Sequence, residues 1–188
     1  SIGLHSRIIP SSLRELICNG AIGGRAKTVD PGLAIATGVL GRDQPGADWS
    51  EKVELRPISQ THAPDRLSAQ HRLWAVNSAL EADLSGQANA EFARDARIAS
   101  GGGQADFVRG ARLGDGATMI VLTSRTRRGQ GRIVSALPAG CPPTTPAQDV
   151  DYVVTELGIA ELRGRSMPER REALIRIAHP DDRAALAA

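Results

Sequence analysis

The chain has 188 residues and a net charge of +2; 41% of its residues are hydrophobic and 23% are charged. These values exclude a disordered polymer, and because no run of eighteen apolar residues occurs, we expect no membrane-spanning helix. The length suits one large domain or two small ones and is enough for a sizeable core; we take a single domain over residues 1–188 as the expectation.

Charge, cysteine and histidine patterns exclude several classes of site. Basic residues gather at 125–132, but no aromatic residues interleave with them to stack on bases, which favours a solvated turn or a phosphate-contacting loop over a nucleic-acid site. Cys18 and Cys141 are far apart in the sequence, which favours reduced thiols and a cytoplasmic location. The four histidines show no paired metal spacing, so we expect no metal.

The first half of the chain mixes helix and strand patterns. Residues 10–19 predict a short helix that Ser11 or Ser12 can cap and Gly20 can end. Residues 35–40 and 53–58 are typical of strands. The apolar segments 73–76 and 80–84 flank Asn77 and Ser78, and residues 84–87 indicate a turn that leaves a strand.

A glycine triplet, Gly101 to Gly103, directly precedes an apolar segment. Three glycines are costly unless something must approach the backbone. Gln104 to Ala111 predict a helix whose free N–H groups lie at the glycines, where an anion or a polarised carbonyl would be welcome. A plain tight turn is the structural alternative.

The second half predicts further strands and two helices. Strands are expected at 119–123, 133–137 and 152–155, and the proline-rich segment 138–149 is expected to be a surface loop. Ser166 and Glu169 form the pattern of a capping box that opens a helix through Ala178, and residues 180–188 predict a last helix. The alternation predicts a mixed α/β domain with a largely parallel sheet flanked by helices.

Three motifs occur in order along the chain: NSALEADLSGQAN from Asn77, GGQADFVRGA from Gly102, and DYVVTELGIAELRGRS from Asp151, with IAHPDDR closing. Together they resemble the C-terminal domain of the acetyl-CoA hydrolase/transferase family, which includes 4-hydroxybutyrate and succinyl-CoA:acetate CoA-transferases. The resemblance implies a NagB/RpiA/CoA-transferase-like fold, in which an N-terminal partner domain faces this one across the active site. We expect that partner domain to be absent from this chain.

The resemblance also implies covalent chemistry on a coenzyme A thioester as substrate, with no permanently bound cofactor. A glutamate of the family attacks the acyl-CoA carbonyl and forms an acyl anhydride, then a glutamyl-CoA thioester. Here Gly3-Leu4-His5-Ser6 is followed by Arg7 at the position of that glutamate. Because a guanidinium stays protonated, Arg7 cannot be the nucleophile. It is expected either to be solvated or to bind a carboxylate or a CoA phosphate.

The remaining site positions also come from the resemblance. His62 lies where many members carry an asparagine that donates to the oxyanion, and Gly102 is the matching backbone donor. Gly101, Gly103 and Gln104 are expected to contact the CoA substrate. Four acidic residues are expected to be structural rather than catalytic: Glu81, Asp106, Glu91 and Glu156.

Three functions stay open. The first is a CoA-transferase-family enzyme that acts on short-chain acyl-CoA. The second is a divergent acyl-CoA hydrolase or acyltransferase without a glutamyl-CoA intermediate, with His62 as a possible base. The third is a non-catalytic acyl-CoA-binding subunit. Because half of the implied fold is missing, we expect association with a separate N-terminal-domain chain or a homodimer.

Overall fold

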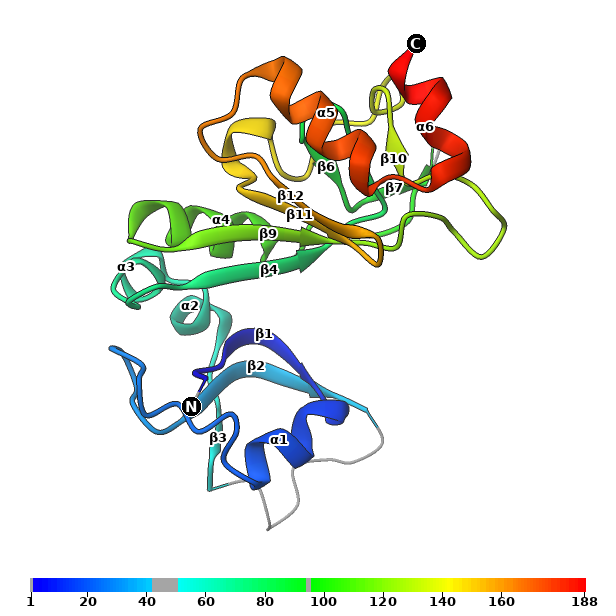
Figure 1. Cartoon of the computed structure of the whole chain (residues 1–188). Coiled ribbons are helices and arrows are strands. Elements are labelled where there is room, and N and C mark those ends of the chain that lie inside the picture. The colour runs from blue at the N-terminus through cyan, green and yellow to red at the C-terminus, as the bar shows by residue number, and fades with distance from the viewer. Residues whose placement is uncertain (1, 42–50, 94–95) are drawn as a thin grey trace. The chain divides into compact units, whose positions relative to one another are not determined.

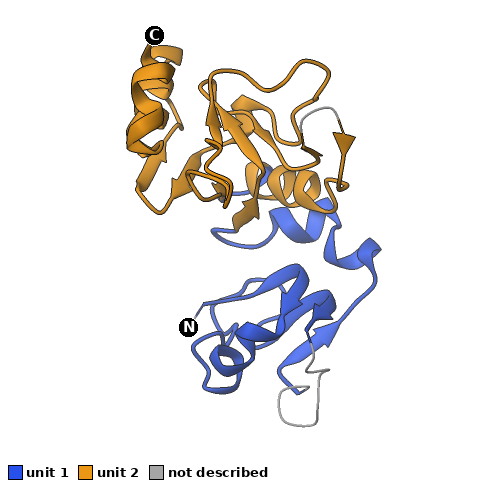
Figure 2. Ribbon diagram, turned by 90° about the vertical axis from the view of Figure 1, so that its right-hand side faces the viewer, with its two compact units in different colours: residues 1–73, 113–116 blue, residues 74–112, 117–188 orange. Residues whose placement is uncertain are grey.

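A computed structural model describes residues 2–41, 51–93 and 96–188. The chain forms two compact units (Figure 2). Unit 1 comprises residues 1–73 with 113–116, and unit 2 comprises residues 74–112 with 117–188. No helix in the described ranges combines the length and the apolar character needed to cross a bilayer.

Unit 1 is built on a parallel three-stranded sheet with the order β1-β2-β3 (Figure 1). Its strands are β1 (His5–Pro10), β2 (Ala34–Leu40) and β3 (Val53–Leu55). After β1 come η1 (Ser11–Leu13) and α1 (Arg14–Cys18). Ile17 of α1 packs with Ile9 and Ala36 in the hydrophobic core of this unit.

The predictions for unit 1 are partly correct. The helix at 10–19 is confirmed as η1 and α1, but no serine side chain caps either element. The expected strand 53–58 is wrong beyond Leu55, because Pro57 lacks an N–H donor and instead precedes α2 (Ile58–Thr61). The sequence analysis missed β1, α2 and α3 (Pro64–Ser68).

Unit 2 contains a four-stranded sheet with the order β12-β11-β9-β4. Its strands are β4 (Trp74–Ser78), β9 (Ala117–Val121), β11 (Tyr152–Thr155) and β12 (Gly158–Glu161). The β4–β9 and β9–β11 pairs are parallel, and β12 is antiparallel to β11. The expected mixed α/β fold with a largely parallel sheet is thus confirmed.

Helices complete this unit. α5 (Met167–Ile177) contacts β12 and β11 (Figure 1) and buries Leu174 and Ile177 against the sheet. The predicted capping box is confirmed, since the backbone N–H and the hydroxyl of Ser166 both donate to Glu169, at 2.8 and 2.7 Å. α6 (Pro180–Ala187) and α4 (Gln104–Leu113) also match their predicted segments.

Unit 2 also contains several short strands. They are β5 (Glu81–Asp83), β6 (Ala88–Asn89), β7 (Phe92–Ala93), β8 (Ala96–Arg97) and β10 (Ile133–Val134). The strand expected at 133–137 is shorter than predicted, because β10 pairs with β5 only as far as Asp83. There the Asp83 carboxylate accepts the Ser85 N–H and turns the chain. The loop predicted at 138–149 is confirmed up to η2 (Ala147–Asp149).

One face of the unit 2 sheet carries exposed apolar side chains. The register pairs Val76 with Met119 and Met119 with Tyr152, so these side chains share a face. Trp74 stacks on Tyr152 with ring centroids 5.4 Å apart. Four large hydrophobic side chains remain exposed here, and we call them the apolar sheet face: Trp74, Val76, Val121 and Ile159.

Candidate functional site

The glycine triplet forms a turn that leads directly into α4. Gly102 has φ +55°, a left-handed conformation that glycine adopts without steric cost. The N–H of Gln104 donates to the Gly101 carbonyl at 3.1 Å, and the N–H of Phe107 donates to the Gly103 carbonyl at 3.1 Å. The turn therefore opens the helix where free backbone N–H groups are expected.

Gln104 lies inside unit 2 rather than at its surface. It is 7% exposed, and its Nε2 donates to Thr145 Oγ1 at 2.8 Å. This bond fixes the first residue of α4 to the proline-rich segment. A substrate role for Gln104 remains a prediction, and its observed partner is structural.

Arg7 lies on β1 in unit 1, and it is exposed. Its neighbours Ser6 and Ile8 are in register with Ala36 and Gly38 of β2. The strand therefore holds the backbone of Arg7 in place while the side chain meets solvent. Position 7 thus carries a guanidinium where the family resemblance implies a carboxylate.

His62 belongs to a buried polar network in the same unit. It is 6% exposed, and a hydrogen bond of 2.8 Å joins its Nδ1 to Thr61 Oγ1. Thr61 Oγ1 is also 2.7 Å from Thr37 Oγ1, and the backbone carbonyl of Thr61 accepts from His5 Nε2 at 2.9 Å. Burial lowers the pKa of His5, so its ring is held neutral more strongly than in water. The sequence analysis did not single out His5, Thr37 or Thr61.

A charged cluster that the sequence analysis missed lies near β1. Lys27 Nζ donates to the carbonyls of Leu4 and Leu33, at 3.2 and 2.9 Å. Burial lowers the pKa of Lys27 to about 8. Nearby, Asp30 accepts from Arg56 at 2.9 Å and from Arg66 at 2.7 Å. These partners are far apart in the sequence, which is why spacing alone does not reveal them.

The predicted site residues thus divide between the two units. Arg7 and His62 lie in unit 1, and Gly101 to Gln104 lie in unit 2. Each group is ordered by contacts within its own unit.

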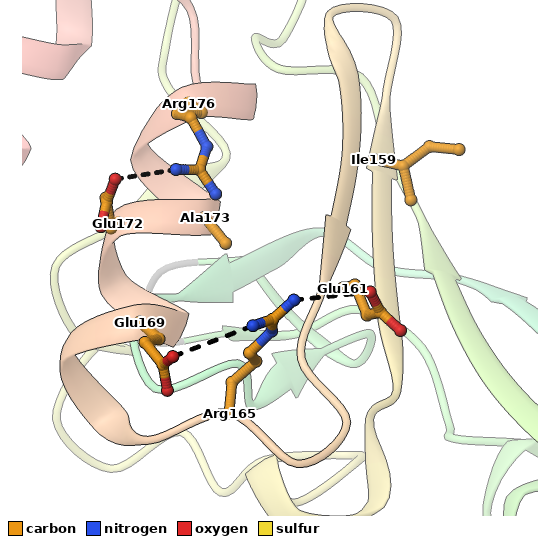
Figure 3. Close-up of a pocket in the computed structure, with 7 residues that line it drawn as sticks. All are labelled: Ile159, Glu161, Arg165, Glu169, Glu172, Ala173 and Arg176. Carbon is orange, nitrogen blue, oxygen red and sulfur yellow. Dashed lines mark hydrogen bonds and ion pairs between the residues drawn. The ribbon is translucent and has the colours of Figure 1, made fainter.

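A surface pocket on unit 2 does not include any of them (Figure 3). It is lined by Ile159, Glu161, Arg165, Glu169, Glu172, Ala173 and Arg176. Arg165 lies between Glu161 and Glu169, at 3.7 and 3.8 Å, and Arg176 pairs with Glu172 at 2.8 Å (Figure 3). The exposed lining holds one more carboxylate than guanidinium, and exposed ion pairs of this kind contribute little to stability. No group of three or more His, Cys, Asp or Glu side chains within the described ranges could hold a metal ion.

The fold and these motifs define an α/β protein of the CoA-transferase type. Residues 46–188 match the family model for the acetyl-CoA hydrolase/transferase C-terminal domain, and the chain belongs to this family. The chain is 34% identical to the succinyl-CoA:cyclohexane-1-carboxylate CoA transferase of Geobacter metallireducens, with 98% of this chain and 43% of the relative aligned. It is 35% identical to the 4-hydroxybutyrate coenzyme A transferase of Clostridium kluyveri, with 99% of this chain and 44% of the relative aligned.

Solved structures agree with this assignment. RipA from Yersinia pestis superposes with a TM-score of 0.85 at 31% identity, over 98% of this chain and 42% of RipA. The chain therefore spans less than half the length of these relatives. Arg7 lies outside the 46–188 family match but within the chain length that the relatives cover almost completely.

Proposed function

We propose that this chain forms one half of a binding site for short-chain acyl-CoA thioesters, and that it forms no glutamyl-CoA at residue 7. The observation that carries the proposal is the glycine turn at the start of α4, with Gly102 at φ +55° and exposed to solvent. Such a turn lets a polarised carbonyl approach backbone N–H groups without meeting a Cβ atom. The named CoA transferases among the relatives support this choice of ligand.

The proposed contacts act on the thioester carbonyl. The Gly102 N–H would donate to the oxygen as negative charge develops, which is worth about 3 kcal/mol per donor in comparable sites. In unit 1, His62 stays a separate candidate for a ring N–H donor. The Thr61 and His5 contacts would hold that ring in one orientation.

Arg7 decides what happens to the bound thioester. A guanidinium has no lone pair to attack the carbonyl at working pH, so no acyl anhydride forms at this position. An exposed guanidinium can bind a carboxylate or a phosphate instead. The thioester is then either held, or passed to water or another acceptor, with His62 as the candidate base.

The proposed whole site needs a second half. We propose that residues 1–188 act as one domain that pairs with a chain supplying the N-terminal half, or with a second copy. The support is that relatives are more than twice as long as this chain and align with nearly all of it.

The test is calorimetric titration of the full chain, with any companion chain, with acetyl-CoA. We expect binding by the natural chain and at least a tenfold loss for Gly102→Val, because a β-branched residue is strained at φ +55° and fills the approach to the backbone. Gly164→Val is the matched control, since Gly164 also has positive φ, +71°, and a Cβ there would meet nothing within 4 Å. Equal affinity for natural chain and Gly102→Val would remove the loop from the site.

A further inference from the structure

Glu91 organises the segment that leads into the glycine turn. Its backbone carbonyl accepts from the N–H groups of Ile98 and Ala99, at 2.8 and 3.2 Å. Its carboxylate accepts from Arg97 at 2.6 Å. The Glu91 side chain is only 14% exposed. One partly buried residue therefore fixes three consecutive residues shortly before the triplet.

The same carboxylate reaches the triplet itself. Thr144 Oγ1 donates to Glu91 Oε2 at 3.2 Å. A Cβ atom added to Gly101 would lie 3.4 Å from this oxygen and 3.1 Å from Thr144 Cγ2, so the glycine sits tightly between the two side chains. The Arg97 hydrogen bond lowers the pKa of Glu91, partly opposed by burial, and the Gly101 N–H and the Thr144 hydroxyl lower it further.

The segment that holds the carboxylate is itself anchored. The Thr144 N–H donates to the Ala88 carbonyl at 2.8 Å, and Thr144 Oγ1 accepts from the Ala90 N–H at 3.0 Å. On the far side of the triplet, Gln104 bonds to Thr145. The turn is therefore held at both ends, while Gly102 between them is exposed.

We propose that Glu91 is a positioning residue that holds Gly101 to Gly103 in the conformation that receives the acyl carbonyl. The proposal rests on the acyl-CoA function proposed above. Glu91 itself touches no substrate in this arrangement, because its oxygens accept from Arg97 and Thr144 and lie against Gly101. Glutamine, the neutral isostere, would direct an NH2 group at these donors and lose some of the hydrogen bonds that the carboxylate accepts.

The first test measures the turn without any ligand, by NMR amide hydrogen exchange on the full chain. Glu91→Gln should speed exchange of the Gly101 amide by about tenfold or more and shift the Gly102 and Gly103 resonances, since hydrogen bonds to charged groups are the stronger ones. Glu91→Asp keeps the charge, so its Gly101 amide should exchange at a rate between those of the natural chain and of Glu91→Gln. Arg97→Ala removes a partner with 61% of its side chain in solvent but leaves the carboxylate beside Gly101, so it should change the glycines less than Glu91→Gln does. Natural exchange rates and resonances in Glu91→Gln would overturn the proposal.

The second test separates positioning from general stability. Free CoA lacks the acyl carbonyl, so Glu91→Gln should weaken acetyl-CoA about tenfold while CoA affinity stays unchanged, and Glu91→Asp should restore part of the loss. Equal weakening of both ligands, or of neither, would contradict a positioning role. If the natural chain binds no acetyl-CoA, the proposed function fails, whereas the exchange experiment still decides whether Glu91 holds the turn.

Discussion

At the scale of single residues, burial shifts the pKa of a side chain in a way that sequence spacing does not reveal. Lys27 illustrates this, because its ammonium group is turned inward to two backbone carbonyls and its pKa is lowered to about 8. Desolvation is the largest cause, and the neighbouring Arg56 and Arg66 act in the same direction against the attraction of Asp30.

This lysine predicts a pH dependence of stability. Its pKa is about 8 in the folded chain and 10.5 in a free side chain, so between these pH values the unfolded chain binds more protons. The free energy of unfolding should therefore rise with pH across this window. Urea unfolding of the natural chain and Lys27→Met at pH 7 and pH 10 checks this. From pH 7 to pH 10, we expect the free energy of unfolding of the natural chain to rise relative to that of the variant. The same change with pH in both proteins would contradict the lowered pKa of Lys27.

At the scale of elements, α5 shows how local signals and tertiary packing combine. The capping box at Ser166 starts the helix, and Leu174 is fully buried in the core of unit 2. Packing of this apolar face supplies most of the helix stability, because isolated helices of this length are marginal.

Truncation of the buried side chain measures this packing. Leu174→Ala should lower the free energy of unfolding by about 2–5 kcal/mol, through lost burial and the cavity left behind. Met167→Ala on the same helix is the control, since Met167 is 56% exposed and its loss should change stability by about 0.5 kcal/mol or less. Equal effects in urea titrations would contradict the packing of α5.

Elements with strong local signals were predictable, and elements that depend on distant partners were not. The capping box and the β-branched run of β2 gave correct segments. β1 was missed because its strand character depends on pairing with β2, about thirty residues away. The candidate site follows the same rule: the glycine turn was visible in the sequence, whereas the Glu91 contact to Thr144 and the Thr61 network join residues more than twenty positions apart.

At the scale of the whole molecule, the apolar sheet face is a candidate interaction surface. Trp74 and Val76 on β4 are 45% and 58% exposed, and Ile159 on β12 is 65% exposed. Contiguous apolar side chains on one sheet face are typical of interaction surfaces. This chain spans less than half the length of the relatives that it matches.

Association is therefore expected. Light scattering at micromolar concentration should give a mass above that of one chain, alone or with a companion chain. Val76→Asp should weaken this association, because it places a charge on the apolar sheet face. Leu40→Asp, on a separate exposed position of β2, should not. A monodisperse monomer for the natural chain, with and without the companion, would count against the partner proposal.

The central claim concerns residue 7, and one measurement tests it most directly. The protein, with any companion chain, is incubated with acetyl-CoA, reduced with borohydride, and analysed by intact mass, since reduction of a glutamyl-CoA thioester turns a carboxyl group into an alcohol. We predict no such mass loss for the natural chain and its appearance in Arg7→Glu, which supplies the missing carboxylate. The loss in the natural chain would show that another glutamate is the nucleophile and would contradict the account.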